Sequence, residues 1–106
     1  MKTTKIVVPD LNDSFSDIVL DGAEYLIRFT YNDTYDFWSV GLYYPDRTPI
    51  VQGLKVVPDF PINVFVDRTR MPRVVLMSTS IRDRIGRYSF VNGEASFAIV
   101  EADDNA

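Results

Sequence analysis

The sequence contains neither cysteine nor histidine, and these two absences exclude a large part of protein chemistry. Without cysteine the chain has no disulfide, no thiolate nucleophile and no zinc-finger or haem-attachment motif. Without histidine it lacks the side chain that most often acts as a general acid or base near neutral pH. A pair of carboxylates can still act alone, so catalysis stays possible. The commonest catalytic mechanisms, however, are excluded. We expect a protein that is not an enzyme and that carries no cofactor or metal.

Long hydrophobic runs are also missing. No stretch approaches the roughly 18 apolar residues of a membrane-spanning helix, so no membrane contact is expected. Near the N-terminus only Ile6, Val7 and Val8 stand together before Pro9, too short a run for a secretion signal. We therefore expect the chain to be made and assembled in the cytoplasm. A length of 106 residues fits one domain, spanning 1–106.

The charges are unevenly distributed along the chain. The net charge is −4, yet residues 67–87 carry six arginines against two aspartates and no lysine. Acidic regions lie on both sides of this segment. Binding to phosphates requires a broad basic face, so an acidic chain is a poor candidate for nucleic-acid binding.

Short runs of β-branched and aromatic residues, broken by turn residues every eight to twelve positions, predict an all-β fold: a small antiparallel sandwich or barrel. Residues 23–31 alternate with a period of two, as in a strand with one buried face. Asp21-Gly22 predicts a two-residue hairpin turn, and Asn32–Tyr35 and Pro45–Pro49 predict the next two turns. Residues 15–57 therefore form a predicted four-strand meander.

The C-terminal half is less regular. Residues 62–67 fit either a strand or a short helical turn, and residues 73–78 fit a strand. Asn92-Gly93 predicts a C-terminal hairpin between residues 87–91 and 95–101. Residues 102–106 form an acidic tail that we expect to be frayed.

The segment Arg28–Tyr43, RFTYNDTYDFWSVGLY, concentrates aromatic side chains, including the only tryptophan, around an acidic turn. Exposed aromatics could stack on sugars or bases. Cross-strand aromatic pairs that stabilise a hairpin are the simpler interpretation, with Tyr31 and Phe37 expected to pair across the turn. The sequence favours packing over binding.

Four aspartates at spacings of three or four, Asp10, Asp13, Asp17 and Asp21, suggest a calcium loop at first sight. An EF-hand loop needs glycine at its sixth position and glutamate at its twelfth. Counted from Asp10, those positions hold Phe15 and Asp21, so the motif fails. A glycosidase pair is formally conceivable, but a chain this short leaves no room for a substrate cleft.

Two segments are candidate partner interfaces. Arginine without lysine suits planar carboxylate partners on another chain, although a solvated face explains the cluster equally well. Residues 5–9 of the N-terminal segment, KIVVP, are apolar and separate from the meander, so we expect residues 1–9 to form an extended arm that adds a strand to a partner's sheet. The interface residues proposed on these grounds are Arg68, Arg70, Arg73, Arg82, Arg84, Arg87, Lys5, Ile6, Val7 and Val8.

A set of turn and core residues is spaced along the N-terminal half in a recognisable pattern. Its members are Gly22, Tyr25, Arg28, Tyr31-Asn32-Asp33, Trp38, Leu42-Tyr43, Asp46, Thr48-Pro49-Ile50, Gly53 and Val57-Pro58. With them the chain, over about residues 5–102, resembles the small baseplate plug family of contractile-tailed phages. It departs from the family pattern at Met71-Pro72-Arg73, where a glycine-rich turn is usual, and in the strand at residues 95–100.

The resemblance implies a non-enzymatic virion component near the axis of the tail baseplate, acting by protein–protein assembly. Its partners would be hub, tube or spike proteins, with several copies in each baseplate. The alternative is a non-catalytic carbohydrate- or receptor-binding β module. Exposure of Trp38 distinguishes the two, since an exposed aromatic shelf favours the binding module and a buried tryptophan favours the structural part.

Overall fold

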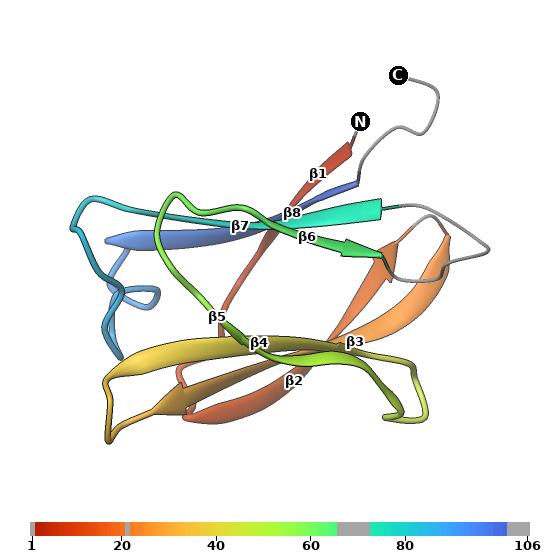
Figure 1. Cartoon of the computed structure of the whole chain (residues 1–106), viewed down its shortest axis with the longest axis horizontal. Coiled ribbons are helices and arrows are strands. Elements are labelled where there is room, and N and C mark those ends of the chain that lie inside the picture. The colour runs from red at the N-terminus through yellow and green to blue at the C-terminus, as the bar shows by residue number, and fades with distance from the viewer. Residues whose placement is uncertain (1, 21, 66–72, 102–106) are drawn as a thin grey trace.

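The computed structural model describes residues 2–20, 22–65 and 73–101, and within them it contains strands and turns but no helix (Figure 1). The predicted Arg68 and Arg70 and the acidic tail lie outside these residues. The strands are β1 (Lys2–Ile6), β2 (Asp13–Leu20), β3 (Ala23–Asn32), β4 (Phe37–Tyr43), β5 (Pro49–Lys55), β6 (Ile62–Phe65), β7 (Arg73–Ser80) and β8 (Ala95–Glu101).

The strands form two four-stranded antiparallel sheets. Sheet A has the order β1-β8-β7-β6 and sheet B has the order β2-β3-β4-β5. Figure 1 shows the two sheets as separate layers. Two proline-containing segments, residues 7–12 and 56–61, carry the chain from one sheet to the other. Because proline donates no backbone hydrogen bond, it ends a ladder at these points. The all-β prediction is confirmed, and the fold is a sandwich.

Sheet B is the predicted four-strand meander. Leu20 pairs with Ala23 across a two-residue turn, and Gly22 has a φ of +78°. That backbone conformation is readily adopted by glycine, as the Asp21-Gly22 hairpin prediction requires. In the next turn the Asn32 side-chain oxygen accepts hydrogen bonds from the backbone N–H groups of Thr34 and Tyr35, at 3.0 and 3.1 Å. Asparagine thus stabilises the turn locally, as expected.

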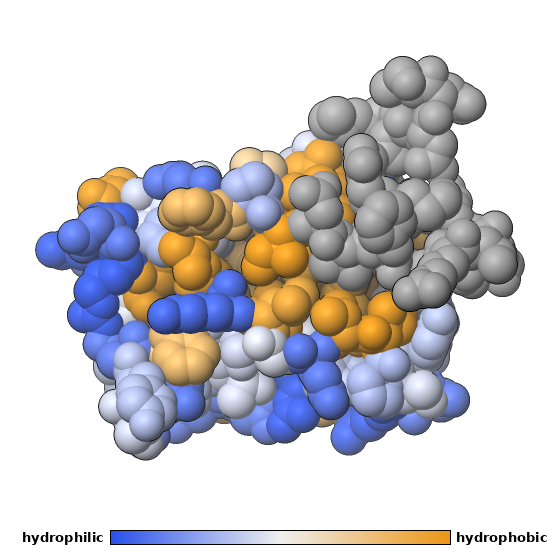
Figure 2. Space-filling model, viewed as in Figure 1, coloured by the Kyte–Doolittle hydropathy of each residue, from blue (hydrophilic) through white to orange (hydrophobic). Residues whose placement is uncertain are grey.

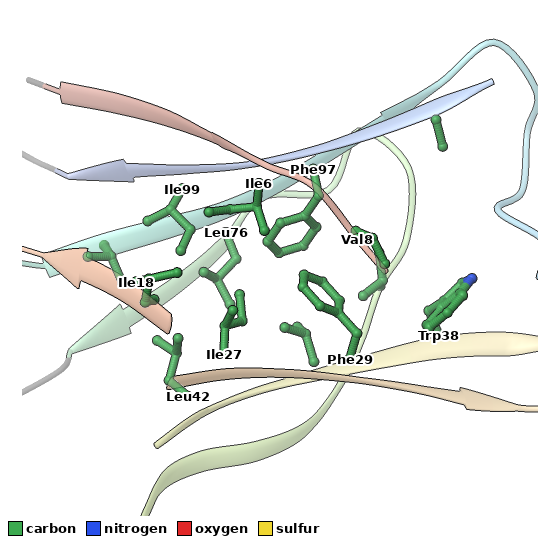
Figure 3. Packing of buried hydrophobic residues seen from close by; sticks show 14 of the residues in the cluster. Ile6, Val8, Ile18, Ile27, Phe29, Trp38, Leu42, Leu76, Phe97 and Ile99 are labelled. Carbon is green, nitrogen blue, oxygen red and sulfur yellow. The ribbon is translucent and has the colours of Figure 1, made fainter. Parts of the chain in front are cut away.

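The core lies between the sheets and draws on both of them (Figure 3). Inward side chains from both sheets meet at the centre, where Phe29 of β3 and Phe97 of β8 pack edge to face with ring centroids 5.0 Å apart. Edge-to-face packing suits the quadrupoles of aromatic rings. The largest fully buried side chains are Trp38, Phe29, Phe97, Ile27, Leu42, Leu76, Ile99, Val40 and Val74. On the surface in Figure 2, hydrophobic residues form a band between the sheets, and hydrophilic residues cover the lower sheet.

The C-terminal pair of antiparallel strands is present, but its first strand differs from the prediction. β8 pairs with β7, so the expected strand over residues 87–91 is wrong. Instead, residues 87–94 form turns, in which the Asn92 N–H donates to the Tyr88 carbonyl and the Ala95 N–H to the Ser89 carbonyl. Asn92-Gly93 therefore closes a compact loop before β8. In the ambiguous segment 62–67, residues Ile62–Phe65 form β6, and residues 66–67 lie outside the described part.

Candidate protein-protein interface

The tryptophan of the aromatic segment packs inward from β4. Trp38 is only 1% exposed, and its ring lies 5.3 Å from that of Tyr31 and 5.8 Å from that of Phe90, measured between centroids. Its Nε1 donates a hydrogen bond of 3.0 Å to the Gly86 carbonyl. Tyr31 is therefore paired with Trp38, whereas Phe37 lies opposite Asn32. The cross-strand packing predicted for this segment is present, with a different aromatic partner.

Burial of Trp38 bears on the two functions considered from the sequence. A sugar- or base-stacking platform needs the face of an aromatic ring open to its ligand. The only tryptophan of the chain instead lies in the core at the end near Gly86 (Figure 3). This favours the structural part over the binding module.

Three arginines of the predicted cluster, Arg82, Arg84 and Arg87, form ion pairs within the protein itself. Arg82 forms an ion pair with Glu94 at 2.8 Å, and Arg84 forms one with Asp36. The first pair closes the connection between β7 and β8, and the second links this connection to the turn after β3. Both arginines remain more than half exposed. Because both side chains are exposed, their guanidinium groups stay accessible to a partner. Exposed ion pairs of this kind contribute little to stability.

Arg87 is held more firmly. It pairs with Asp10 at 2.9 Å and donates a 2.5 Å hydrogen bond to the Asn12 side-chain oxygen. Its guanidinium also lies over the rings of Trp38 and Tyr88, 5.7 and 4.9 Å from their centroids. With 17% of its side chain exposed, Arg87 joins the β1–β2 connection to the β7–β8 connection. It therefore has a structural role that the sequence did not reveal, because its partners lie some 75 residues away.

The N-terminal segment is part of the sandwich. All five residues of β1 pair with β8, from Lys2 opposite Glu101 to Ile6 opposite Phe97. Ile6 and Val8 are buried among the core residues, while Lys5 and Val7 are exposed, Val7 at 82%. Figure 3 shows the two buried side chains pointing between the sheets. The expected free arm is thus an edge strand of sheet A, and Lys5 and Val7 are its side chains available to a partner.

Two aspartates of the rejected calcium motif, Asp10 and Asp13, form ion pairs, with Arg87 and Arg28 respectively. Asp13 accepts two hydrogen bonds of 2.7 Å from Arg28 and one of 3.2 Å from Thr30. The bonds from the Arg28 guanidinium lower the pKa of Asp13, against an opposing effect of burial. Among the residues the structure describes, no group of acids is arranged to hold a metal ion. The same residues contain no helix that is long and apolar enough to cross a membrane.

The outer face of sheet B carries a cluster that the sequence analysis missed. Phe15 lies beneath two guanidinium groups, that of Arg28 at 5.3 Å and that of Arg47 at 4.7 Å, and it packs against Tyr43 at 5.2 Å. The Tyr43 hydroxyl donates to the Gln52 side-chain oxygen at 3.0 Å. Cross-strand register brings these residues together. The predicted meander places these strands side by side, but it does not give the register that sets Phe15 opposite Arg28.

Two surface hollows accompany these features. One of about 390 Å³ lies on the outer face of sheet B around Gly41, bordered by Arg28, Tyr43 and Gln52. The other, of about 500 Å³, lies between β1 and β2, where residues 4–7 face residues 16–19. Small-molecule sites usually combine apolar lining with convergent polar groups that await a ligand. Here Arg28, Tyr43 and Gln52 bond to one another or to Asp13.

Together, these features define a class: a small structural β-sandwich whose described polar side chains mostly bind one another and whose open features are sheet edges. The family described as cyanophage baseplate Pam3 plug gp18 matches residues 1–102. The chain belongs to this family, which is one of structural baseplate proteins of phages. No curated protein matches the sequence.

Proposed function

We propose that this protein is a plug or hub-associated component of a contractile phage tail, acting by assembly with other baseplate proteins and without turnover. The observation that carries the proposal is the family match, which spans almost the whole chain. A baseplate component resides in the tail of the virion, and we propose that this one is made and assembled in the host cytoplasm. Its partners would be hub, tube or spike proteins, with several copies in each baseplate.

The surface supports an assembly role. Exposed side chains of both signs, such as the basic Arg82 and Lys5 and the acidic Asp17, allow docking by charge complementarity. Arg68, Arg70, Arg73 and Lys5–Val8 remain proposed interface residues. Of these, the side chains of Ile6 and Val8 lie in the core and would act only by holding β1 in place.

The first test is quantitative mass spectrometry of gradient-purified tails, counting copies of this chain per particle. A small fixed number, constant between preparations, is the expected result. Absence from purified tails would overturn the proposal. The measurement needs no knowledge of the neighbours, and it distinguishes a tail component from a cytoplasmic protein of the same infection.

A second measurement addresses the alternative of a carbohydrate- or receptor-binding module. The chain has a single tryptophan, so its intrinsic fluorescence reports Trp38 alone. We expect blue-shifted emission with weak acrylamide quenching in the folded state, and no change on adding sugars. Quenching as strong as in the denatured chain would restore the binding module as a candidate.

A further inference from the structure

The four outer edges of the two sheets are not equivalent. β5 begins with Pro49, contains Gly53 at a φ of +74° and shows two register shifts against β4. β6 has four residues and follows Pro61. Proline, bulges and short length are the devices by which proteins prevent an edge from pairing with another strand. The edges of β5 and β6 are therefore protected.

The opposite edges lack these devices. β1 and β2 contain neither proline nor glycine, and they pair with their neighbours through five and eight consecutive residues without a bulge. β1 is short and carries lysines, which discourage pairing. β2 is longer and contains no lysine or arginine. Of the four edges, that of β2 is the one best suited to accept another strand.

Hydrogen-bond geometry shows which backbone groups of β2 point outward. The Tyr31 N–H donates to the carbonyl of Asn12, directly opposite it, at 2.7 Å. Such hydrogen-bonded pairs alternate along an antiparallel ladder, so Ser14, Ser16 and Ile18 also face β3. The N–H and C=O groups of the intervening residues, including Asp17 and Val19, therefore point away from the sheet.

The surroundings of this edge have a definite chemical character. The hollow of about 500 Å³ between β1 and β2 borders it, with Val7 82% and Val19 53% exposed. Asp17 and Lys5 also line the hollow, and neither makes an ion pair within the described part of the chain. An incoming strand would thus meet two exposed valines, one free carboxylate and a row of unpaired backbone groups.

We propose that an extended segment of a neighbouring baseplate protein binds along β2 as a fifth strand of sheet B. This rests on the proposed function, which supplies such a neighbour. The segment presents apolar side chains to Val7 and Val19 and a lysine or arginine to Asp17. Backbone hydrogen bonds give affinity in this mode of recognition, and alternating side chains give specificity. A second copy of this chain is a poorer occupant, because β2 has two aspartates and no base to place opposite Asp17.

The decisive variant is Val19→Pro, compared with Val19→Ala. Proline removes one outward N–H without touching the hydrogen bonds to β3, whereas alanine keeps that N–H. Both variants are introduced into the phage, and copies per purified tail are counted beside the thermal melt of each isolated protein. We expect Val19→Pro to lose at least tenfold in copies per tail and Val19→Ala to stay within about threefold, with both melts near that of the wild type. Wild-type incorporation of a folded Val19→Pro protein would overturn the proposal.

Two further measurements keep the test decisive if Val19→Pro does not fold. Asp17→Lys reverses the free charge and should also reduce incorporation at least tenfold. A photo-cross-linking residue at position 19 should yield, in purified tails, an adduct with a different tail protein. An adduct with a second copy, or none, would contradict the proposal. If the wild-type chain were absent from tails, the proposed function itself would fail. If the wild-type chain were present and folded Val19→Pro were incorporated equally well, only the proposed strand addition would fail.

Discussion

At the scale of single residues, Trp38 connects parts of the chain that are far apart in sequence. Its ring packs on Tyr31 and Phe90, and its indole N–H satisfies the Gly86 carbonyl. The Arg87 guanidinium also lies over the Trp38 ring. This one side chain therefore fixes the β7–β8 connection against sheet B.

Replacing Trp38 by phenylalanine should lower the free energy of unfolding by about 2 kcal/mol, because the Gly86 carbonyl loses its donor and the smaller ring leaves space. Urea denaturation followed by circular dichroism measures the change. Tyr35→Phe is the control, since Tyr35 is 77% exposed and should change stability by less than about 0.5 kcal/mol. Equal effects of the two substitutions on stability would contradict the role of Trp38 as a hydrogen-bonded core residue.

The Asp13–Arg28 pair makes stability depend on pH. The pKa of Asp13 is lowered in the folded state. The pair therefore stabilises the protein fully above the ordinary aspartate pKa, and this contribution is lost as pH falls through the lowered pKa. Asp13→Asn should therefore cost about 0.5–1 kcal/mol at pH 7, a small value because both side chains are partly exposed. Urea titrations at pH 7 and pH 2.5 should show a smaller difference in stability between wild type and variant at pH 2.5 than at pH 7. A difference that persisted unchanged at pH 2.5 would exclude the ion pair as its cause.

At the scale of elements, sheet B was predictable from local patterns. Its strands follow one another in sequence, and Gly22 and Asn32 stabilise two of its turns with signals that lie within the turns. Sheet A was not, because β8 pairs not only with the preceding strand β7 but also with β1, which is distant from it along the chain. The Asn92-Gly93 signal predicted a turn correctly, but a turn does not specify which strand enters it.

Gly41 allows β4 and β5 to approach each other. A Cβ at this position would lie 2.9 Å from the Val51 carbonyl oxygen and 3.1 Å from the Gln52 Cα, both backbone atoms. Gly41→Ala should therefore destabilise the protein by about 1–3 kcal/mol, measured by urea denaturation. For Gly86→Ala the nearest atom is 3.6 Å away, so this control should change stability by at most about 0.5 kcal/mol. A neutral Gly41→Ala would show that the strands can separate at no cost.

For β1, adjacent residues provide a matched pair. Ile6→Ala removes buried methyl groups and should lower the free energy of unfolding by about 2–4 kcal/mol. Val7→Ala alters an exposed side chain and should have an effect below about 0.5 kcal/mol. Thermal melts of the two variants give the comparison. If β1 instead behaved as a free arm, both melts would match the wild type.

At the scale of the whole molecule, the sequence left sandwich and barrel open. The choice depends on where the chain changes sheet, at residues 7–12 and 56–61, and on which edges then remain unpaired. The candidate interface was equally hard to predict. Arg82, Arg84 and Arg87 are close in sequence, but they pair with acids from different loops. The unprotected edge of β2 can be identified only from the strand order.

The shared core predicts a single unfolding transition. Both sheets contribute to one cluster, so neither can bury its inner face alone. Thermal transitions followed by Trp38 fluorescence, which reports sheet B, and by far-ultraviolet circular dichroism, which reports all strands, should coincide. Two separated midpoints would indicate sheets that unfold independently.

The pairing of the first strand with the last also sets an order in time during synthesis. Sheet B joins neighbouring strands, so it can form while the chain is still being translated. β1 must wait, because its only partner strand, β8, begins at Ala95. Until β8 leaves the ribosome, β1 has no strand of sheet A to pair with, and Ile6 and Val8 are not yet held in the core. Closure of the sandwich, and with it the final form of the edges that other proteins meet, is therefore a late event in the life of the nascent chain.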